Sequence, residues 1–264
     1  MNLMEDLMKE SVINGIGCLL GQEHVLAERE TIIFVHGAGS SHAMWVPQMG
    51  PLSKQFNTIA VNLPGHGLGR EKGEDTIAGY VRAVRELIDG LGLKNVVLVG
   101  LSMGGGVVQE FALTYPDRLK AVILLSTGAR LKVMPQMFEI IRNNFEAYLK
   151  FLPEFAFSRS TSPEIIRPTI EEARKQKPEV VYGDFKACDG FDVRERVKEI
   201  RLPCLIISGT EDKLTPPKLQ DYLHEQIAGS KLIRLEDAGH ILNVEKPREV
   251  NKVITEFIGS LDRN

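Results

Sequence analysis

Cysteine is scarce in this sequence and the charges are nearly balanced. The 264 residues include three cysteines, Cys18, Cys188 and Cys204, which are too few and too dispersed for a disulfide framework or a zinc site. The formal net charge is −3, and the 32 Lys and Arg residues are scattered. The charge therefore gives no reason to expect nucleic acid or an anionic membrane as a partner.

Long apolar runs are also missing. No stretch approaches the length needed to span a bilayer. The first residues, MNLMEDLMKESVINGIG, carry acids early and do not have the pattern of a signal peptide. We therefore expect a cytoplasmic protein. The length suits one well-buried domain, with room for an inserted subdomain.

Strand-like and helix-like segments alternate along most of the chain. After a short hairpin expected near residues 11–28, strands are predicted at Thr31–Val35, Thr58–Asn62, Asn95–Leu101, Ala121–Ser126, Cys204–Ser208 and Lys231–Leu235. Helices are predicted near Met44–Lys54, Thr76–Leu91, Met103–Tyr115, Pro217–Gln226 and Arg248–Leu261. This alternation predicts an α/β fold whose mostly parallel central sheet has helices on both faces.

The stretch 130–199 breaks this alternation. Apolar and aromatic residues recur there at helical spacing, and five prolines interrupt the pattern. One interpretation is a helical excursion with its own small core. We favour a helical cap, inserted after the sixth strand, whose apolar residues line a substrate pocket. The predicted division is a core domain of residues 1–129 and 200–264 and a cap subdomain of residues 130–199.

Ser102 lies between glycines where a strand-like run meets a helix-like one, in VVLVGLSMGGGVVQEFAL (residues 96–113). It could be a nucleophile, part of a phosphate-binding loop or part of an ordinary turn. The spacing of the glycines and the lack of a following lysine argue against a phosphate loop. A G-x-S-x-G match alone is weak evidence, because its expected count by chance is roughly 0.1 in a chain this rich in glycine. A strand before it and a helix after it are the setting of a nucleophile elbow.

A serine nucleophile needs a base, and the base needs an acid to orient it. Among the six histidines, His240 follows the last predicted strand, whereas His36 and His66 lie in glycine-rich turns where packing roles are expected. Asp212 follows the strand Cys204–Ser208 and is the predicted acid. Glu211 and Asp237 are its competitors.

Taken together, these motifs resemble the α/β-hydrolase fold family, in its serine carboxylesterase and enol-lactonase branch. The matching segments are HGAGSS (36–41), NLPGHG (62–67), GLSMGG (100–105), SGTEDKLTPP (208–217) and AGHILNVEKP (238–247). The resemblance implies a catalytic triad of Ser102, Asp212 and His240. It also implies an oxyanion hole formed by the backbone N–H groups of Ala38 and Met103. The chain departs from the family pattern at Asn62 and Gly69.

The expected reaction is ester hydrolysis through an acyl-enzyme, on small to medium, largely apolar substrates. No cofactor and no metal is expected, and a monomer and a homodimer remain equally open. The candidate pocket residues are Met134, Phe138, Phe145, Leu214 and Ile241.

Two alternatives remain open. The GLSMGG and SGTEDKLTPP segments are also similar to enol-lactonases and cofactor-free perhydrolases. A lactonase for an acidic substrate should place cationic cap residues at the site, and the candidates are Arg130, Arg142, Arg159, Arg167 and Arg174. The other alternative is a non-catalytic ligand sensor with the same triad.

Overall fold

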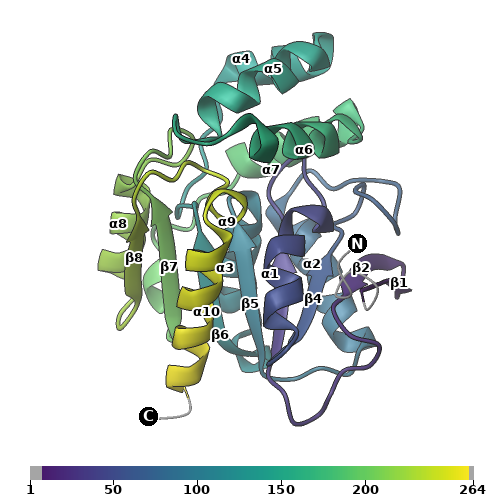
Figure 1. Ribbon diagram of the computed structural model, residues 1–264, viewed down its shortest axis with the longest axis vertical. Coiled ribbons are helices and arrows are strands. Elements are labelled where there is room, and N and C mark those ends of the chain that lie inside the picture. Colours follow the sequence, from purple (N-terminus) through teal and green to yellow (C-terminus); the bar gives the residue numbers. More distant parts are fainter. Residues whose placement is uncertain (1–7, 262–264) are drawn as a thin grey trace.

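An eight-stranded sheet forms the centre of the computed structural model, which describes residues 8–261 (Figure 1). The strand order is β1-β2-β4-β3-β5-β6-β7-β8. The strands are β1 (Lys9–Ile13), β2 (Ile16–Leu20), β3 (Thr31–Val35), β4 (Asn57–Val61), β5 (Val96–Leu101), β6 (Leu119–Leu125), β7 (Cys204–Gly209) and β8 (Lys231–Leu235). The pairs β1–β2 and β2–β4 are antiparallel. All the following pairs in the sheet order, from β4–β3 to β7–β8, are parallel. The predicted mostly parallel α/β sheet is confirmed.

The N-terminal hairpin is shorter than expected. β1 and β2 are joined by Asn14 and Gly15, whose φ angles of 51° and 79° suit a tight two-residue turn. The hairpin ends at Leu20 and does not reach residue 28. Gly21 donates its N–H to the Thr58 carbonyl, one step further along the antiparallel pairing of β2 with β4. The prediction that the N-terminal segment is not a signal peptide falls partly on residues 1–7, which lie outside the described residues.

Helices cover both faces of the sheet. On one face lie α2 (Ile77–Gly90), α3 (Met103–Thr114) and α8 (Lys218–Gln226), and on the other lie α1 (Val46–Leu52) and α10 (Pro247–Leu261). Successive strand residues point to opposite faces. In β3, Ile33 and Val35 pack toward the first group of helices, while Ile32 and Phe34 pack toward the second. Both faces are therefore dry, and the open positions are at the strand ends.

Four helices occupy the stretch between β6 and β7, at the top of Figure 1. They are α4 (Pro135–Asn143), α5 (Phe145–Phe155), α6 (Pro163–Arg174) and α7 (Pro178–Asp189). Prolines begin α4, α6 and α7, where a missing N–H costs nothing. We expected Pro153 and Pro168 to separate helices, but they lie inside α5 and α6. We call residues 130–199 the cap region.

None of the helices in residues 8–261 combines the length and the apolar character that crossing a bilayer requires.

Candidate active site

Ser102 lies on a sharp turn between β5 and α3. Its φ and ψ of 57° and −116° are strained values for a residue with a side chain. The turn requires glycine on both sides. A Cβ on Gly100 would lie 2.2 Å from the Gly104 carbonyl oxygen, and a Cβ on Gly104 would lie 2.2 Å from that of Val35. The sequence G-x-S-x-G thus allows the backbone to present the Ser102 side chain above the strand end.

Asp212 and His240 are paired at the ends of β7 and β8. The His240 Nδ1 atom lies 2.9 Å from Asp212 Oδ2 and 3.1 Å from Oδ1, and both side chains are buried. Since the carboxylate accepts, Nδ1 carries the proton. His240 Nε2 has no hydrogen-bond partner among the described residues. The imidazole is therefore oriented by Asp212 and has its second nitrogen available.

Further donors fix the Asp212 carboxylate. Its Oδ1 accepts from the backbone N–H groups of Leu214 (2.9 Å) and Thr215 (2.8 Å), and its Oδ2 accepts from the Thr215 hydroxyl (2.7 Å). Burial raises the pKa of Asp212, but the charge of His240 and these donors outweigh it, so that the pKa lies below its usual value. Asp212 is therefore held as a carboxylate.

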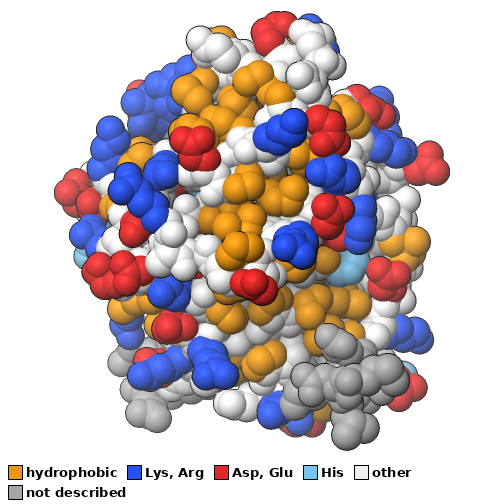
Figure 2. Space-filling model, turned by 45° about the horizontal axis from the view of Figure 1, so that its top comes forward, with side chains coloured by type: hydrophobic (Ala, Val, Ile, Leu, Met, Phe, Trp, Pro, Cys, Tyr) orange, Lys and Arg blue, Asp and Glu red, His pale blue; other side chains and the backbone are white. Residues whose placement is uncertain are grey.

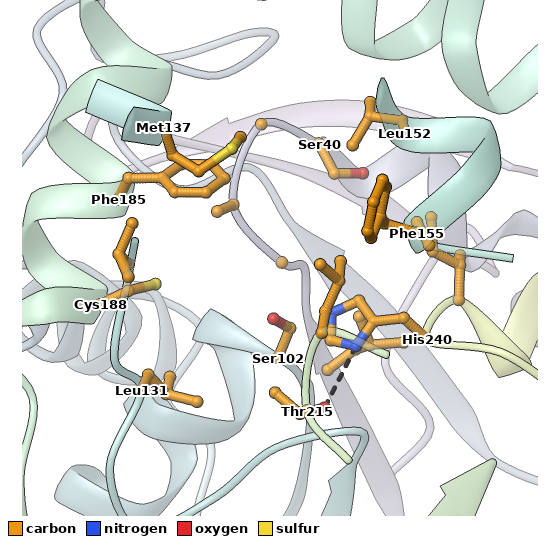
Figure 3. Close-up of a pocket in the computed structure, with 18 of the residues that line it drawn as sticks. Ser40, Ser102, Leu131, Met137, Leu152, Phe155, Phe185, Cys188, Thr215 and His240 are labelled. Atoms are coloured by element: carbon orange, nitrogen blue, oxygen red, sulfur yellow. Dashed lines mark hydrogen bonds between the residues drawn. The ribbon is translucent and has the colours of Figure 1, made fainter. Parts of the chain in front are cut away.

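Sequence reasoning missed the role of Thr215. Its hydroxyl lies 3.2 Å from His240 Nδ1, so it touches both members of the pair (Figure 3). A signal was present, because an aspartate side chain commonly accepts from the backbone two residues further on, and such a turn at Asp212 and Leu214 brings the next residue, Thr215, close to the carboxylate.

The competing acids lie elsewhere. Glu211 accepts hydrogen bonds from the Ser158 hydroxyl and the Arg159 N–H in the cap region. Asp237, with φ of 51°, donates its backbone N–H to the Thr210 hydroxyl. Among the three acids, Asp212 is the one in hydrogen-bond contact with His240.

The loop that carries His240 is tied to the cap region. The backbone N–H groups of His240 and Ile241 both donate to the Ala156 carbonyl, at 3.0 and 3.1 Å. The carboxylate of buried Glu245, in α9 (Leu242–Glu245), accepts from Gly239 N–H (3.0 Å) and from Ser158 N–H (2.8 Å). The position of the imidazole thus depends on contacts with a segment more than 80 residues away in sequence.

The predicted oxyanion residues flank the serine. Met103 is the first residue of α3, where backbone N–H groups have no partner within the helix. Ala38 lies in the loop after β3, and its N–H has no acceptor among residues 8–261. Ala38 and Ser102 line the same cavity.

This cavity has a volume of about 600 Å³ and lies between the strand ends and the cap region. Ser102 and His240 lie at its base, and Met137, Leu152, Phe155 and Phe185 from the cap helices surround it (Figure 3). Most of the lining side chains are apolar. Figure 2, in which the top of Figure 1 comes forward, shows apolar side chains gathered along the middle of this face between groups of charged ones.

Three of the five predicted pocket residues, Met134, Leu214 and Ile241, line the cavity. Phe138 and Phe145 are not among the described lining residues. Phe138 packs edge-to-face on Tyr182, and Phe145 stacks on Tyr148. The cap helices have apolar residues on more than one face, so helical spacing alone did not distinguish the cavity side from the packing side.

The charged residues that line the cavity are all basic: Arg130, Lys132, Arg194 and Lys213. Arg130 and Arg194 both pair with Asp192, and Lys132 pairs with Asp189 at 2.8 Å. The Lys213 ammonium instead donates to the Glu154 carbonyl at 2.7 Å. Of the five predicted cationic residues of the cap region, Arg130 is the one that lines the cavity.

Within residues 8–261, no three His, Cys, Asp or Glu side chains are grouped in a way that could hold a metal ion.

Comparison with known proteins agrees with this architecture. The family model described as "alpha/beta hydrolase fold" matches residues 30–247, and the chain belongs to this family. The putative 2-succinyl-6-hydroxy-2,4-cyclohexadiene-1-carboxylate synthase of Bacillus subtilis is 29% identical, over 88% of this chain and 91% of that protein.

Two solved structures are also similar. The enol-lactonase from Burkholderia xenovorans is 26% identical with a TM-score of 0.87, covering 95% of this chain and 100% of the other. A thermophilic esterase from Thermogutta terrifontis is 25% identical with a TM-score of 0.85, covering 96% and 99%. The expected relation to esterases and enol-lactonases is confirmed.

Proposed function

We propose that this protein is a serine hydrolase that cleaves carboxylic esters of small to medium, largely apolar substrates. Membership of the α/β-hydrolase family and similarity to an esterase and an enol-lactonase make it a carboxylesterase-type hydrolase. The proposal concerns the catalytic residues and the substrate. It rests above all on one observation: a strained serine turn and an oriented, buried His–Asp pair line one apolar cavity.

In the proposed mechanism Ser102 is the nucleophile. His240 Nε2 takes the Ser102 proton as Oγ attacks the ester carbonyl, and Asp212 stabilises the imidazolium that forms. The backbone N–H groups of Ala38 and Met103 bind the negative oxygen of the tetrahedral intermediate, and each such donor is worth roughly 2.7–4 kcal/mol.

The intermediate collapses when His240 returns the proton to the departing alcohol oxygen. A water molecule then attacks the acyl-Ser102 carbon, and His240 takes a proton from it. The acid is released and Ser102 regains its hydrogen. The apolar cap residues around the cavity would bind the acyl or alcohol chain and exclude other water.

A lactonase acting on an acidic substrate is the second candidate. It is favoured by one observation, which is that every charged residue lining the cavity is basic. Ion pairs with Asp189 and Asp192 already occupy three of these residues, so the ester remains the first choice. Lys213 forms no salt bridge among the described residues, although the Glu211 carboxylate is close enough to interact with its charge, and it is the best-placed cation for a substrate carboxylate.

Hydrolysis of p-nitrophenyl acetate, butyrate and octanoate by wild type and Ser102→Ala tests the proposal. Loss of the nucleophile should lower kcat by roughly 10⁶-fold. Ser260→Ala, on the far end of α10, is the matched control and should hydrolyse at the wild-type rate. The chain-length profile measures the size of the pocket.

Negligible wild-type turnover on all three esters would reject the general esterase. A charged lactone and its uncharged methyl ester should then be compared. Preference for the charged lactone, lost in Lys213→Gln, would establish the lactonase. Tight binding of a ligand without turnover would instead indicate a sensor.

A further inference from the structure

A second buried His–Asp pair lies beneath the loop that carries Ala38. Asp184, on α7 of the cap region, is fully buried. Its Oδ2 accepts from the Gly39 backbone N–H at 2.8 Å and lies 2.9 Å from His66 Nε2. Its Oδ1 accepts from the Tyr80 hydroxyl. The Asp184 carboxylate of the cap region thus contacts the loop that carries Ala38 and the side chains of His66 and Tyr80.

The surroundings of His66 in this pair favour its positively charged form. Its Nδ1 lies 3.2 Å from both the Leu63 and the Pro64 carbonyl oxygens, while Nε2 faces Asp184. Acceptors on both sides require a proton on both nitrogens. Burial lowers the pKa of His66, but the charge and hydrogen bonds of Asp184 outweigh burial and raise the pKa overall. These contacts favour a carboxylate–imidazolium pair.

His36 orients the peptide group of Ala38 from the core side. Its Nε2 accepts from Leu63 N–H at 3.1 Å, so Nδ1 carries the single proton and donates to the Gly37 carbonyl at 2.8 Å. Burial, together with the nearby His66 charge, lowers the pKa of His36 and keeps it neutral. The Gly37 carbonyl and the Ala38 N–H belong to one planar trans peptide group, so fixing the first orients the second.

The next peptide group is held from the cap side. Gly39 has φ of 66°, and a Cβ there would lie 2.8 Å from the Tyr148 hydroxyl, so the loop requires glycine at this point. Glycine is also the residue with the greatest backbone freedom. The hydrogen bond from Gly39 N–H to Asp184 removes that freedom one residue after the predicted oxyanion donor.

We propose that Asp184 is a positioning residue for the oxyanion hole, through which the cap region fixes the Ala38 N–H in its catalytic direction. This inference rests on the proposed function. Asp184 does not touch the substrate. It acts through Gly39, and its essential property is an oxygen acceptor at the right distance.

Three variants separate this role from a role in folding: Asp184→Ala, Asp184→Asn and Asp184→Glu. The amide oxygen of asparagine can still accept from Gly39 N–H, so Asp184→Asn should keep kcat within about fivefold of wild type. Asp184→Ala lacks the acceptor, and kcat should fall about 10- to 100-fold, as expected for a misplaced catalytic group. KM should stay within about threefold, because the substrate cavity is unchanged. Asp75→Asn, which removes an exposed carboxylate paired with Lys186 of α7, is the matched control.

A fluorophosphonate gives a second measurement that needs no substrate. Ser102 Oγ forms a bond to phosphorus, fluoride leaves, and the phosphoryl oxygen takes the place of the oxyanion. The labelling rate should fall in Asp184→Ala by the same factor as kcat. A wild-type protein that is not labelled at Ser102 would refute the proposed function. A labelled wild type with an equally reactive, folded Asp184→Ala would refute this inference alone.

Circular dichroism and thermal melting establish whether each variant is folded. If Asp184→Ala does not fold, Asp184→Glu decides, since it keeps the charge but moves the oxygen, and kcat should fall at least tenfold. If neither folds, Asp184→Asn decides. A loss of kcat above about 20-fold in the asparagine variant would mean that the charge matters and not the position of the acceptor, and would overturn the proposal.

Discussion

The two buried His–Asp pairs of this molecule have the same separation and differ in what surrounds the second imidazole nitrogen. In both, the carboxylate oxygen lies 2.9 Å from an imidazole nitrogen. His240 lines the cavity, and its second nitrogen has no hydrogen-bond partner among the described residues. The second nitrogen of His66 faces two backbone carbonyls.

This difference suits His240 to act as a general base and His66 to remain a protonated partner of Asp184. A general base needs one nitrogen oriented by an acid and the other free to take a proton. His66 satisfies the first condition and fails the second, because losing a proton would leave a buried carbonyl without a donor. A His–Asp contact by itself therefore does not mark an active site. The partner of the second nitrogen decides.

The largest contrast should come from removing the base. His240→Ala should lower kcat on p-nitrophenyl butyrate by roughly 10⁴- to 10⁶-fold, since His240 is the one histidine among the described residues that line the cavity. Steady-state kinetics at pH 7.5 measures it. His24→Ala, at an exposed position beside Glu23, is the matched control and should match wild type. A His240→Ala enzyme within 100-fold of wild type would show that another base operates.

The same substitution in the two acids should give unequal losses. Asp212→Asn would favour the wrong imidazole tautomer and should lower kcat by roughly 10⁴-fold. Asp184→Asn should keep kcat within about fivefold of wild type, since it leaves the His240 side unchanged. Comparable losses in the two variants, measured side by side at saturating substrate, would contradict the assignment of Asp212 as the catalytic acid.

A smaller effect is expected from Thr215→Val. This change keeps the shape but removes the hydroxyl that donates to Asp212, so the carboxylate loses one of its donors and part of its orientation. We expect kcat to fall about tenfold, which corresponds to about 1.4 kcal/mol. Thr114→Val, an exposed threonine of α3, supplies the control. Unchanged kinetics would show that the two backbone N–H groups suffice to hold Asp212.

The smallest effect concerns stability and pH. The His66 pKa is raised in the folded protein, so the stability that the pair contributes is full below about pH 6.5. It is lost as the pH rises through the raised pKa of His66. Urea unfolding of wild type and Asp184→Asn between pH 6 and 9 measures it. The stability difference should shrink with rising pH, whereas Asp75→Asn should differ from wild type by a small, constant amount.

The core of the molecule could be predicted from local sequence because its signals are local. β3 and β8 have the predicted bounds, and β5 and β7 differ by one residue, since short apolar runs bounded by turn residues define buried strands. The residues proposed as the triad lie in the turns that follow β5, β7 and β8, and parallel strands bring these strand ends to one edge of the sheet. The positions of these turns and the family resemblance together predicted the contact between Asp212 and His240. The catalytic roles of the three residues stay a prediction.

The cap region could not be predicted to the same depth. Asp184 and Gly39 are 145 positions apart, and no local pattern links them. Phe138 and Phe155 both belong to the series of apolar residues that recur at helical spacing in the cap region. Of the two, Phe155 lines the cavity and Phe138 does not. Packing against other helices decides which part of the wide apolar side of a cap helix meets the substrate, and the sequence of that helix alone does not contain this information.

The two hydrogen bonds from the His240 loop to Ala156 have a consequence for how substrate arrives. If α5 lifted away as a rigid flap, it would pull on the backbone that holds the base, and the open form would be catalytically incompetent. We therefore expect the substrate to enter the cavity between side chains at its rim. Met134 and Leu214 are two such side chains, and they are 55% and 39% exposed. Bulk at these two positions, more than the mobility of the helices, should then govern the rate at which large esters enter.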